Sequence, residues 1–363
     1  MADIVIQGLG AVSPAGWGVP PLAHAIAHRP SLPIATVPGP TPNRTYTLRK
    51  VPAPPSRPAF LSQPRLRRSS VISHFTLAAA LEALGSPSPP HPSPASRVGI
   101  VFCTMTGSVI YSRRFYEEVL REPATASPLL FPETVYNAPA SHLAAVLGTT
   151  GRVHTEVGDA TCFLKGLHTA SLWLEIQAVD RCLVIAAEEG DWLSADGYSY
   201  LSRPGTASEG AGALLLARHD GSPCLARLAH LTDPIAYSAR LSPHQAATAM
   251  RQALAATPKP VPPESTLLVD AIGSSHRLDR AERAAWSDWT GPRLSPKSTL
   301  GEAWAAGAAW QCVAAIQALS PTPPLPLPLP LPSLQRALVS VLGTQESAMG
   351  IAFDPPPPTP SIA

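Results

Sequence analysis

The sequence predicts an α/β protein built around buried sheets. Apolar runs of strand length alternate with apolar segments of helical length, which is the pattern of strands joined by covering helices. Several of these runs are apolar on all sides, as expected for elements covered on both faces. The order of strands and helices repeats loosely, so we expect two similar halves, residues 1–220 and residues 221–363.

The first half is predicted to open with a buried strand at residues 4–6, followed by a tight glycine turn at residues 8–13. Helical spacing of apolar residues predicts a helix over residues 75–84, which Gly85 ends. The other elements expected here are a strand at 97–102, a glycine-containing loop at 103–108, a short helix at 140–147, an apolar helix at 166–178 and a strand at 181–186.

At the boundary between the two halves, apolar runs at residues 212–217 and 224–229 flank a His-Asp-Gly-Ser turn and predict a β-hairpin. Ser242 followed by Pro243 predicts the start of a helix that runs to residue 256. The later elements expected are a strand at 266–270, a long apolar helix at 303–319 and strands at 336–341 and 349–353.

Proline is unusually frequent: 44 of the 363 residues are proline, whereas proline usually makes up about 5% of a chain. The prolines gather at residues 86–94, in a loop at 321–332 and in the tail at 354–363. Because proline lacks an N–H, these clusters predict connections rather than central strands. The alternating Pro-Leu run at 324–332 favours polyproline II. We interpret it as a stiff loop before the last strands; a recognition motif for a proline-binding module is the alternative.

The composition excludes several function classes. Apolar residues make up 45% of the chain and charged residues 14%, and a net charge of +2 without a basic block gives no reason to expect a nucleic-acid partner. No apolar run reaches about 18 residues, and the N-terminus does not resemble a signal peptide, so we expect a cytoplasmic protein. No disulfide, cofactor or metal is expected, because the cysteines are widely spaced and odd in number: Cys103, Cys162, Cys182, Cys224 and Cys312.

Residues 157–170 are the most informative stretch, reading Val-Gly-Asp-Ala-Thr-Cys-Phe-Leu-Lys-Gly-Leu-His-Thr-Ala. This stretch resembles the nucleophile turn of a β-ketoacyl synthase, which has a pattern like Thr-Ala-Cys-x-Ser-Gly-x-His-Ala. An ungapped match pairs Thr161, Gly166 and His168 with the pattern. Phe163 then occupies the nucleophile position, and Cys162 falls one residue early.

Further matches to the β-ketoacyl synthases follow in the same order along nearly the whole chain. They imply a thiolase-like fold, in which two similar halves form a five-layered α-β-α-β-α core. The matching segments are Ile4 to Gly16, Phe131 to Asn137, Leu147 to Gly151, Ala186 to Glu189, Ser208 to Leu216 and Lys297 to Gly301.

The resemblance breaks at the reacting positions. In the family, a cysteine thiolate attacks the acyl thioester, and two histidines and a lysine assist decarboxylation and stabilise the enolate. The two histidine positions correspond here to Ile272 and Glu302, and only Lys297 keeps the family residue. The glycine loop that gates the family's cysteine reads Gly343-Thr344-Gln345-Glu346. Isoleucine donates no hydrogen bond and a carboxylate only accepts them, so condensation should be lost.

Each of these residues has a structural alternative. Cys162 becomes the nucleophile if the turn shifts by one residue, and otherwise packs in the core. Phe163 either plugs the acyl tunnel or is an ordinary core aromatic. Glu302 either caps the dipole of the helix it opens or forms a salt bridge with Lys297 or a partner.

Two histidines near these positions also have alternative roles. His276 lies four residues beyond the lost histidine, and either reaches into the site or is a solvated or capping residue. His168 follows the nucleophile turn and is expected to face the core or a dimer interface. Lys297 stands at its family position, where it either assists catalysis or has a purely structural role.

The resemblance implies a chain-length factor, the non-catalytic subunit that pairs with an active β-ketoacyl synthase in type II polyketide systems. The expected partners are that ketosynthase, in a heterodimer joined along a central strand pair and adjoining helices, and an acyl carrier protein. The residues expected to shape the tunnel or the interface are Thr104, Met105, Asn137, Phe163 and Thr344.

Two other functions stay open at this point. One is an active acyltransferase or ketosynthase-like enzyme that uses Cys162, and the other is a free-standing structural or carrier-binding module. The product class is also open, because an aromatic polyketide, an aryl polyene or another polyene fits equally well.

Overall fold

The computed structural model describes residues 3–85, 97–201, 205–238, 240–257, 259–320, 334–345 and 347–357. The proline-rich loop predicted at 321–332, the cluster at 86–94 and the end of the predicted tail therefore lie outside the described residues. Within the described part of the chain, no helix is both long and apolar enough to cross a membrane.

Ten strands follow one another across the main sheet in the order β13-β12-β14-β15-β10-β1-β9-β7-β5-β6, and two short strands pair off this path. The first half contributes β1 (Ile4–Ser13), β2 (Gly16–Trp17), β5 (Val98–Thr104), β6 (Val153–Val157), β7 (Arg181–Glu188) and β9 (Gly210–Arg218). The second half contributes β10 (Ala226–Leu231), β11 (Ile235–Ala236), β12 (Thr266–Val269), β13 (Arg293–Leu294), β14 (Arg336–Leu342) and β15 (Ser347–Asp354).

The two halves repeat the same five-stranded arrangement. In the first half β5 runs parallel to β6 and β7, and the order continues antiparallel through β9 to β1. In the second half β12 runs parallel to β13 and β14, and the order continues antiparallel through β15 to β10. Pairing of β1 with β10 joins the halves. The chain crosses from one half to the other after β9; the predicted boundary at residue 220 itself stays a prediction.

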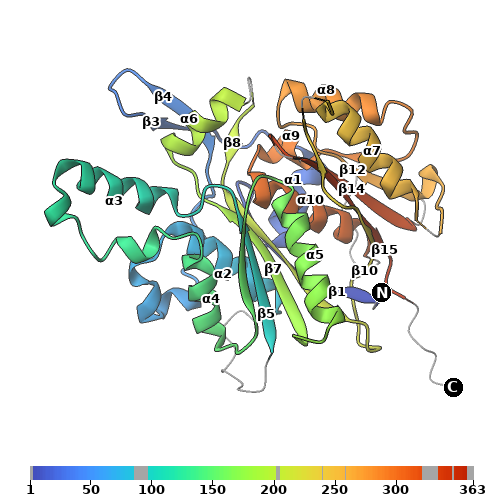
Figure 1. Cartoon of the computed structure of the whole chain (residues 1–363), viewed down its shortest axis with the longest axis horizontal. Helices are drawn as coiled ribbons and strands as arrows, with labels where there is room; N and C mark the ends of the chain where they lie inside the picture. Colours follow the sequence, from blue (N-terminus) through green and yellow to red (C-terminus); the bar gives the residue numbers. More distant parts are fainter. Residues whose placement is uncertain are drawn as a thin grey trace.

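Helices cover both faces of this sheet (Figure 1). They are α1 (Val19–His28), α2 (Val71–Ala83), α3 (Val109–Arg121), α4 (Ala138–Leu147), α5 (Cys162–Glu175), α6 (Trp192–Leu201), α7 (Pro243–Ala255), α8 (His276–Ala285), α9 (Pro296–Leu300) and α10 (Trp304–Leu319). A small sheet is formed by β3 (Ala35–Pro38), β4 (Thr45–Arg49) and β8 (Ala207–Ser208). Short 3₁₀ helices lie at η1 (Ala59–Ser62), η2 (Pro64–Arg68), η3 (Pro123–Thr125), η4 (Phe131–Glu133) and η5 (Pro263–Ser265).

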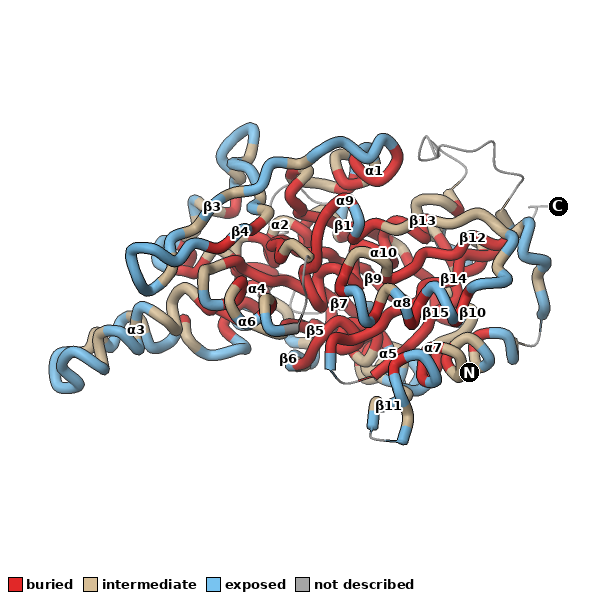
Figure 2. Tube along the Cα trace, turned by 90° about the horizontal axis from the view of Figure 1, so that it is seen from above, coloured by how far each residue is buried: buried red, intermediate tan, exposed pale blue. Residues whose placement is uncertain are grey.

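Three apolar cores define five layers. The central core holds α5 and α10 between strands of the two halves, which explains why α10 is buried along almost its whole length. A second core packs α2 and α4 on the outer face of the first half, and a third packs α7 and α8 on the outer face of the second half. Figure 2 shows this buried interior, with α3 extending away from it. The predicted α/β class and the five-layered arrangement are confirmed.

Two local predictions were wrong. Residues 8–13 do not form a turn, because β1 continues unbroken to Ser13. The glycines serve close packing instead: a Cβ at Gly8 or Gly10 would lie 1.8 or 1.9 Å from a carbonyl oxygen of α2. The runs at 212–217 and 224–229 do not pair as a hairpin either, because β1 lies between β9 and β10 and pairs with both.

Candidate functional site

The segment that resembles a nucleophile turn lies between β6 and α5. Cys162 is the first residue of α5 and Phe163 the second, and both side chains are fully buried. The helix begins four residues earlier than the predicted 166–178 because residues 159–161 already form its first turn: the Cys162 N–H donates to the Asp159 carbonyl at 3.0 Å. Both candidate residues therefore lie directly after this turn, at the start of α5.

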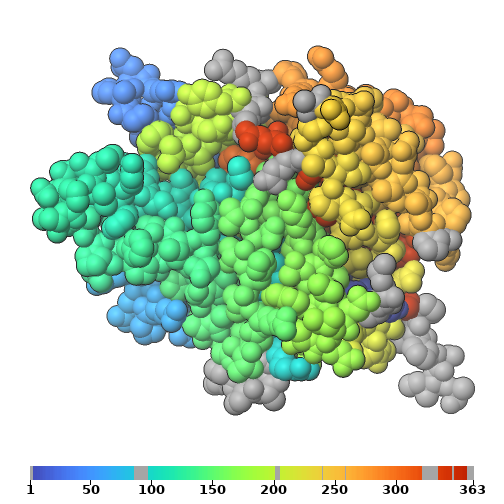
Figure 3. All heavy atoms as spheres, in the orientation of Figure 1, coloured from blue at the N-terminus to red at the C-terminus, as the bar shows by residue number. Residues whose placement is uncertain are grey.

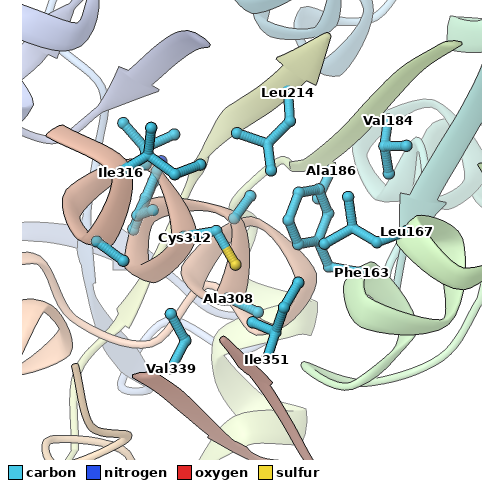
Figure 4. Close-up of a cluster of buried hydrophobic side chains, with 14 of the residues drawn as sticks. Phe163, Leu167, Val184, Ala186, Leu214, Ala308, Cys312, Ile316, Val339 and Ile351 are labelled. Atoms are coloured by element: carbon cyan, nitrogen blue, oxygen red, sulfur yellow. The ribbon is translucent and has the colours of Figure 1, made fainter. Parts of the chain in front are cut away.

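The Phe163 ring points into the central core. Figure 4 shows the ring directed towards apolar side chains of α10 and of strands in the main sheet, among them Ala186, Leu214 and Cys312. The aromatic ring therefore fills interior space at the position where the resemblance expects the reactive cysteine. Both interpretations given for Phe163 from the sequence are compatible with this placement.

The Cys162 thiol is held in its neutral form. Burial raises its pKa well above the ordinary value, and the neighbouring Cys103 thiol and the negative charges of Glu188 and Asp159 act in the same direction. The thiolate is the nucleophilic form of cysteine, and reactive cysteines lie in electropositive, partly exposed surroundings. Neither condition is met at Cys162.

Lys297 and Glu302, the two residues that the sequence resemblance pairs with the family's lysine and second histidine, form a buried ion pair. The Lys297 Nζ lies 2.9 Å from Glu302 Oε2, and the side chains are 0% and 1% exposed. Ser274 completes the group: its hydroxyl donates to Glu302 Oε2 and accepts from Lys297 Nζ at 3.3 Å. The second carboxylate oxygen accepts the Trp304 N–H at 2.8 Å, at the start of α10. Glu302 therefore combines both predicted roles, the salt bridge and the helix cap.

The other position that the resemblance assigns to a histidine is occupied by Ile272. Ile272 is half-buried in a loop, and its own backbone N–H donates to the Asp270 carboxylate at 3.0 Å. His276 is the exposed first residue of α8, and Ser275 is the residue that caps this helix by accepting from the Leu278 N–H. Within the described residues, no hydrogen bond joins the His276 imidazole to Lys297 or Glu302.

Asp159 ties the nucleophile turn to the altered glycine loop. Its carboxylate accepts from the Thr161 N–H at 3.2 Å and the Thr161 hydroxyl at 3.1 Å, while its other oxygen accepts from the Gln345 N–H at 3.2 Å. A Cβ at Gly343 would lie 2.2 Å from that oxygen, so only glycine allows this approach. Thr344, one of the predicted tunnel residues, is nearly buried within this loop.

Two aromatic residues that the sequence did not single out close the space beside Ser274. The Tyr198 hydroxyl donates to the Ser274 carbonyl, and its ring meets the Trp304 ring edge to face at 5.7 Å. Trp304 has φ of 41°, a left-handed conformation that is rare for a bulky residue. No local pattern indicated either residue, because Tyr198 and Trp304 are far apart in the sequence and meet only in the folded chain.

The predicted tunnel residues fall into two groups. Thr104 and Met105 are at the site, because the buried Glu188 carboxylate accepts from the Met105 N–H at 2.6 Å and Met105 packs against Tyr198 and Trp304. Burial raises the pKa of Glu188 to about 7. Asn137, in contrast, is exposed at the residue before α4.

A separate feature is an exposed apolar surface along the free edge of the sheet. β6 is the last strand of the main sheet, and Val153 and Val157 on it are 45% and 49% exposed. On the neighbouring α5, His168, Leu172 and Ile176 are exposed at four-residue spacing. His168 therefore does not face the core. We call these five residues the edge surface.

A second exposed apolar group lies on the arm formed by α3 and the following segment, which projects from the body in Figures 1 and 3. Its exposed side chains are Tyr116, Leu120, Leu129, Phe131, Val135 and Tyr136. Isolated exposed apolar residues are ordinary, but groups of this size indicate an interaction surface.

The fold is that of the β-ketoacyl synthases. The chain superposes on the ishigamide ketosynthase/chain length factor with a TM-score of 0.78 at 19% identity, covering 97% of this chain and 99% of that one. A ketosynthase in complex with a type II polyketide acyl-carrier protein, AntDE:AntF, gives 0.77 at 17% identity and coverage of 98% and 100%. A β-ketoacyl synthase from Burkholderia phymatum STM815 gives 0.78 at 16% identity with the same coverage.

No protein-family model matches the sequence, and no curated protein matches it. The structural likeness is therefore the finding that identifies the class, a thiolase-like fold of the ketosynthase type. Within the described residues, no group of three or more His, Cys, Asp or Glu is placed to hold a metal ion.

Proposed function

We propose that this chain is a non-catalytic ketosynthase-like subunit, a chain-length factor, that pairs with an active β-ketoacyl synthase in type II polyketide or aryl-polyene and fatty-acid-like biosynthesis in the cytoplasm. The observation that carries the proposal is the buried pair of Lys297 and Glu302 with Ser274, which lies where the sequence resemblance expects a catalytic lysine and a catalytic histidine.

This pair is unsuited to ketosynthase chemistry. Condensation needs hydrogen-bond donors aimed at the oxygen where negative charge develops. Glu302 supplies an acceptor there, and its charge would repel an enolate. Lys297 is already engaged by Glu302 and Ser274, so its ammonium group is not free for a substrate oxygen. Phe163 and the neutral Cys162 thiol supply no nucleophile.

The edge surface supports the heterodimer. An edge strand presents unpaired N–H and C=O groups that another strand can continue, and here the flanking side chains are apolar. Antiparallel pairing of β6 with the corresponding strand of a ketosynthase would cover Val153 and Val157 and bring the exposed face of α5 against the partner. The apolar arm at α3 would add a second contact.

Chain-length control is the role that fits such a subunit. The interior beside the lost active site is filled by Phe163 and by the Tyr198, Trp304 and Met105 contacts. A subunit of this kind contributes shape to the tunnel of its partner and does not bind an acyl chain in its own site. Thr104, Met105, Phe163 and Thr344 are the residues that we propose for this wall; Asn137 is proposed for the interface because it is exposed.

Co-purification tests the heterodimer. We expect the wild-type chain to co-purify with an active β-ketoacyl synthase encoded beside it, and Leu172→Asp with Ile176→Asp to abolish this. Ile34→Asp with Leu193→Asp is the matched control, because both residues are exposed and apolar but lie away from the edge surface. A wild-type chain that forms a stable homodimer with no affinity for a ketosynthase would contradict the proposal.

A labelling experiment separates this function from an active acyltransferase that uses Cys162. The purified complex is incubated with an acyl carrier protein thioester, and acylated peptides are identified by mass. We expect acylation on the partner ketosynthase only. Acylation of this chain at Cys162 that disappears in Cys162→Ala would establish the alternative, in which the position of Cys162 at the N-terminus of α5 activates the thiol.

A further inference from the structure

Two tryptophans line a pocket in the second half of the chain, on the side of the molecule opposite α3 in Figure 1. Residues of α7, of β14 and of the segment after α8 border it, and its volume is about 200 Å³. Its apolar lining includes Trp286, Trp289, Leu254 and Val261, and we call these four residues the tryptophan pocket. The two indole rings meet edge to face at 5.4 Å. None of the four belongs to the candidate site or to the edge surface.

One polar group of the tryptophan pocket lacks a partner. Trp286 is only 2% exposed, and within the described residues its Nε1–H meets no hydrogen-bond acceptor. The corresponding group of Trp289 differs, because it donates to the Pro292 carbonyl at 3.3 Å. An indole N–H can only donate, and a buried donor without an acceptor is unfavourable. A ligand that brings a carbonyl oxygen to this ring would satisfy it.

The charged groups that border the tryptophan pocket are already paired. They are Arg251 and Arg336. Arg251 Nη2 lies 3.0 Å from Asp288 Oδ2, and the guanidinium group covers the Trp286 ring at 5.0 Å from its centroid. Arg336 Nε lies 2.7 Å from Asp354 Oδ1. The pocket is therefore suited to an uncharged ligand that offers apolar groups and carbonyl oxygens.

A second pocket adjoins the first, because Val261 lines both. Its volume is about 490 Å³, and its lining includes Pro355, Pro356 and Pro357, the last described residues of the chain. The sequence continues with Pro-Thr-Pro-Ser-Ile-Ala at residues 358–363, which lie outside the described residues and carry no charged side chain. The described chain thus ends beside the tryptophan pocket.

A proline-rich segment has the chemistry that this pocket requires. The polyproline II conformation has no internal hydrogen bonds, so its carbonyl oxygens stay free to accept them. Such segments dock in grooves lined by aromatic side chains. At about 3.1 Å per residue, six residues in this conformation would span roughly 19 Å, which is enough to pass from one pocket into its neighbour.

We propose that the tryptophan pocket binds residues 358–363 of the same chain, with the Trp286 Nε1–H donating to a backbone carbonyl of that segment and the Trp289 ring packing against a proline. Because the segment begins beside the pocket, docking is intramolecular, and a high effective concentration favours it over a proline-rich segment of another molecule. The proposal goes beyond the proposed function and does not depend on it, since the edge surface lies in the other half of the chain.

Competition with a free peptide tests this docking. The probe is a fluorescein-labelled peptide with the sequence of residues 355–363, and fluorescence anisotropy measures its dissociation constant. Two full-length chains are compared, the wild type and Pro358→Ser with Pro360→Ser and Ile362→Ser, which we call the tail variant. We expect the tail variant to bind the peptide about tenfold or more tightly than wild type, because its own segment no longer occupies the pocket.

Substitutions in the pocket are made in the tail variant. Trp289→Ala should abolish peptide binding, and Trp286→Phe, which keeps a ring but loses the N–H, should weaken binding about fivefold. Trp192→Ala on α6 is the control for a partly exposed tryptophan and should leave binding unchanged. If Trp289→Ala proves unstable, Ala255→Trp fills the pocket from the exposed surface of α7, with the exposed Ala284→Trp on α8 as its control.

Three outcomes would overturn the proposal. Equal affinity of the peptide for wild type and the tail variant would show that the segment does not occupy the pocket of its own chain. Absence of binding to either chain would show that the pocket takes no proline-rich ligand. If a peptide with the sequence of residues 324–332 bound the tail variant more tightly than the probe, the pocket would be assigned to the Pro-Leu run instead.

Discussion

Lys297 and Glu302 each satisfy the other in the interior, so neither tolerates the loss of its partner. Removing one member of a buried ion pair leaves an uncompensated charge, which costs about 3–5 kcal/mol. The Ser274 hydroxyl hydrogen-bonds to both members of the pair, and the Trp304 N–H donates to Glu302. A buried pair of this kind stabilises one specific arrangement of α9 and α10.

We therefore expect Glu302→Gln to lower the free energy of unfolding by about 3 kcal/mol, because the Lys297 ammonium loses its counter-charge. The double variant Lys297→Met with Glu302→Leu should recover much of this loss. Urea unfolding measures both. Arg97→Met is the control, since its pair with Asp180 is half-exposed and its removal should leave stability unchanged. A Glu302→Gln variant as stable as wild type would contradict this role.

Three buried glutamates make stability depend on pH. Burial raises the pKa of Glu188, Glu189 and Glu282 to about 7, above the value of about 4.3 in an unfolded chain. Between these values the folded protein binds more protons than the unfolded chain. The free energy of unfolding should therefore fall as pH rises from about 5 to about 7 and level off above that.

Urea unfolding across this pH range checks the prediction. Glu188→Gln should make the decline shallower, because one of the three groups no longer titrates. Glu264→Gln, at the exposed 3₁₀ helix η5, is a control that should follow the wild-type curve. Stability that rises over the same interval would show that these carboxyl groups are ionised more easily in the fold than in the unfolded chain.

At the scale of elements, β1 depends on how closely it approaches α2. A Cβ at Gly10 would lie 1.9 Å from the Ala79 carbonyl oxygen, which is backbone and cannot turn aside. Strand and helix would have to separate along much of their contact. The same residue type in α6 has the opposite environment, because nothing lies within 4 Å of a Cβ at Gly197.

Alanine at these two glycines should thus have opposite effects. We expect Gly10→Ala to lower the unfolding free energy by about 3 kcal/mol through overpacking. Gly197→Ala should raise it by about 0.5–1 kcal/mol, because alanine loses less backbone entropy in a helix. Thermal or urea unfolding measures both variants, and a Gly10→Ala variant as stable as wild type would contradict the close approach of β1 to α2.

At the scale of the molecule, partner binding should appear as stabilisation. A ligand that binds only the folded state raises the free energy of unfolding, by about 2.7 kcal/mol at one hundred times its dissociation constant. We expect the thermal midpoint of this chain to rise with the concentration of the active ketosynthase. Leu172→Asp with Ile176→Asp should remove that dependence, and a midpoint independent of ketosynthase concentration would contradict the heterodimer.

The sequence predicted the fold class well because continuous apolar runs mark the buried elements of this chain, and the length of each run separates strands from helices. The continuous apolar runs at β5, β7, β14 and α10 are each buried on all sides, and each was predicted. β6 and α3 were not, because neither contains a continuous apolar run. Under the proposed function a partner protein would cover their exposed apolar side chains, and the sequence of one chain does not contain that partner.

The sequence singled out residues of the candidate site, but it did not indicate how they are arranged. Matching the family patterns found Phe163, Ile272, Lys297 and Glu302, and one of the alternatives for Glu302 was the salt bridge that the structure contains. The pattern could not reveal the contact between Tyr198 and Trp304, because the two residues are far apart in the sequence. The pairing of both β9 and β10 with β1 was likewise missed, since local turn signals say nothing about a strand inserted from far away in the chain.

The free edge at β6 also bears on how much of this protein a cell should make. A strand with unpaired backbone groups and exposed valines joins whichever strand it meets first, including that of another copy. Surplus chain would therefore accumulate as self-paired or aggregated material. We expect its synthesis to be matched to that of its ketosynthase, and expression alone to yield less soluble protein than expression of the two together.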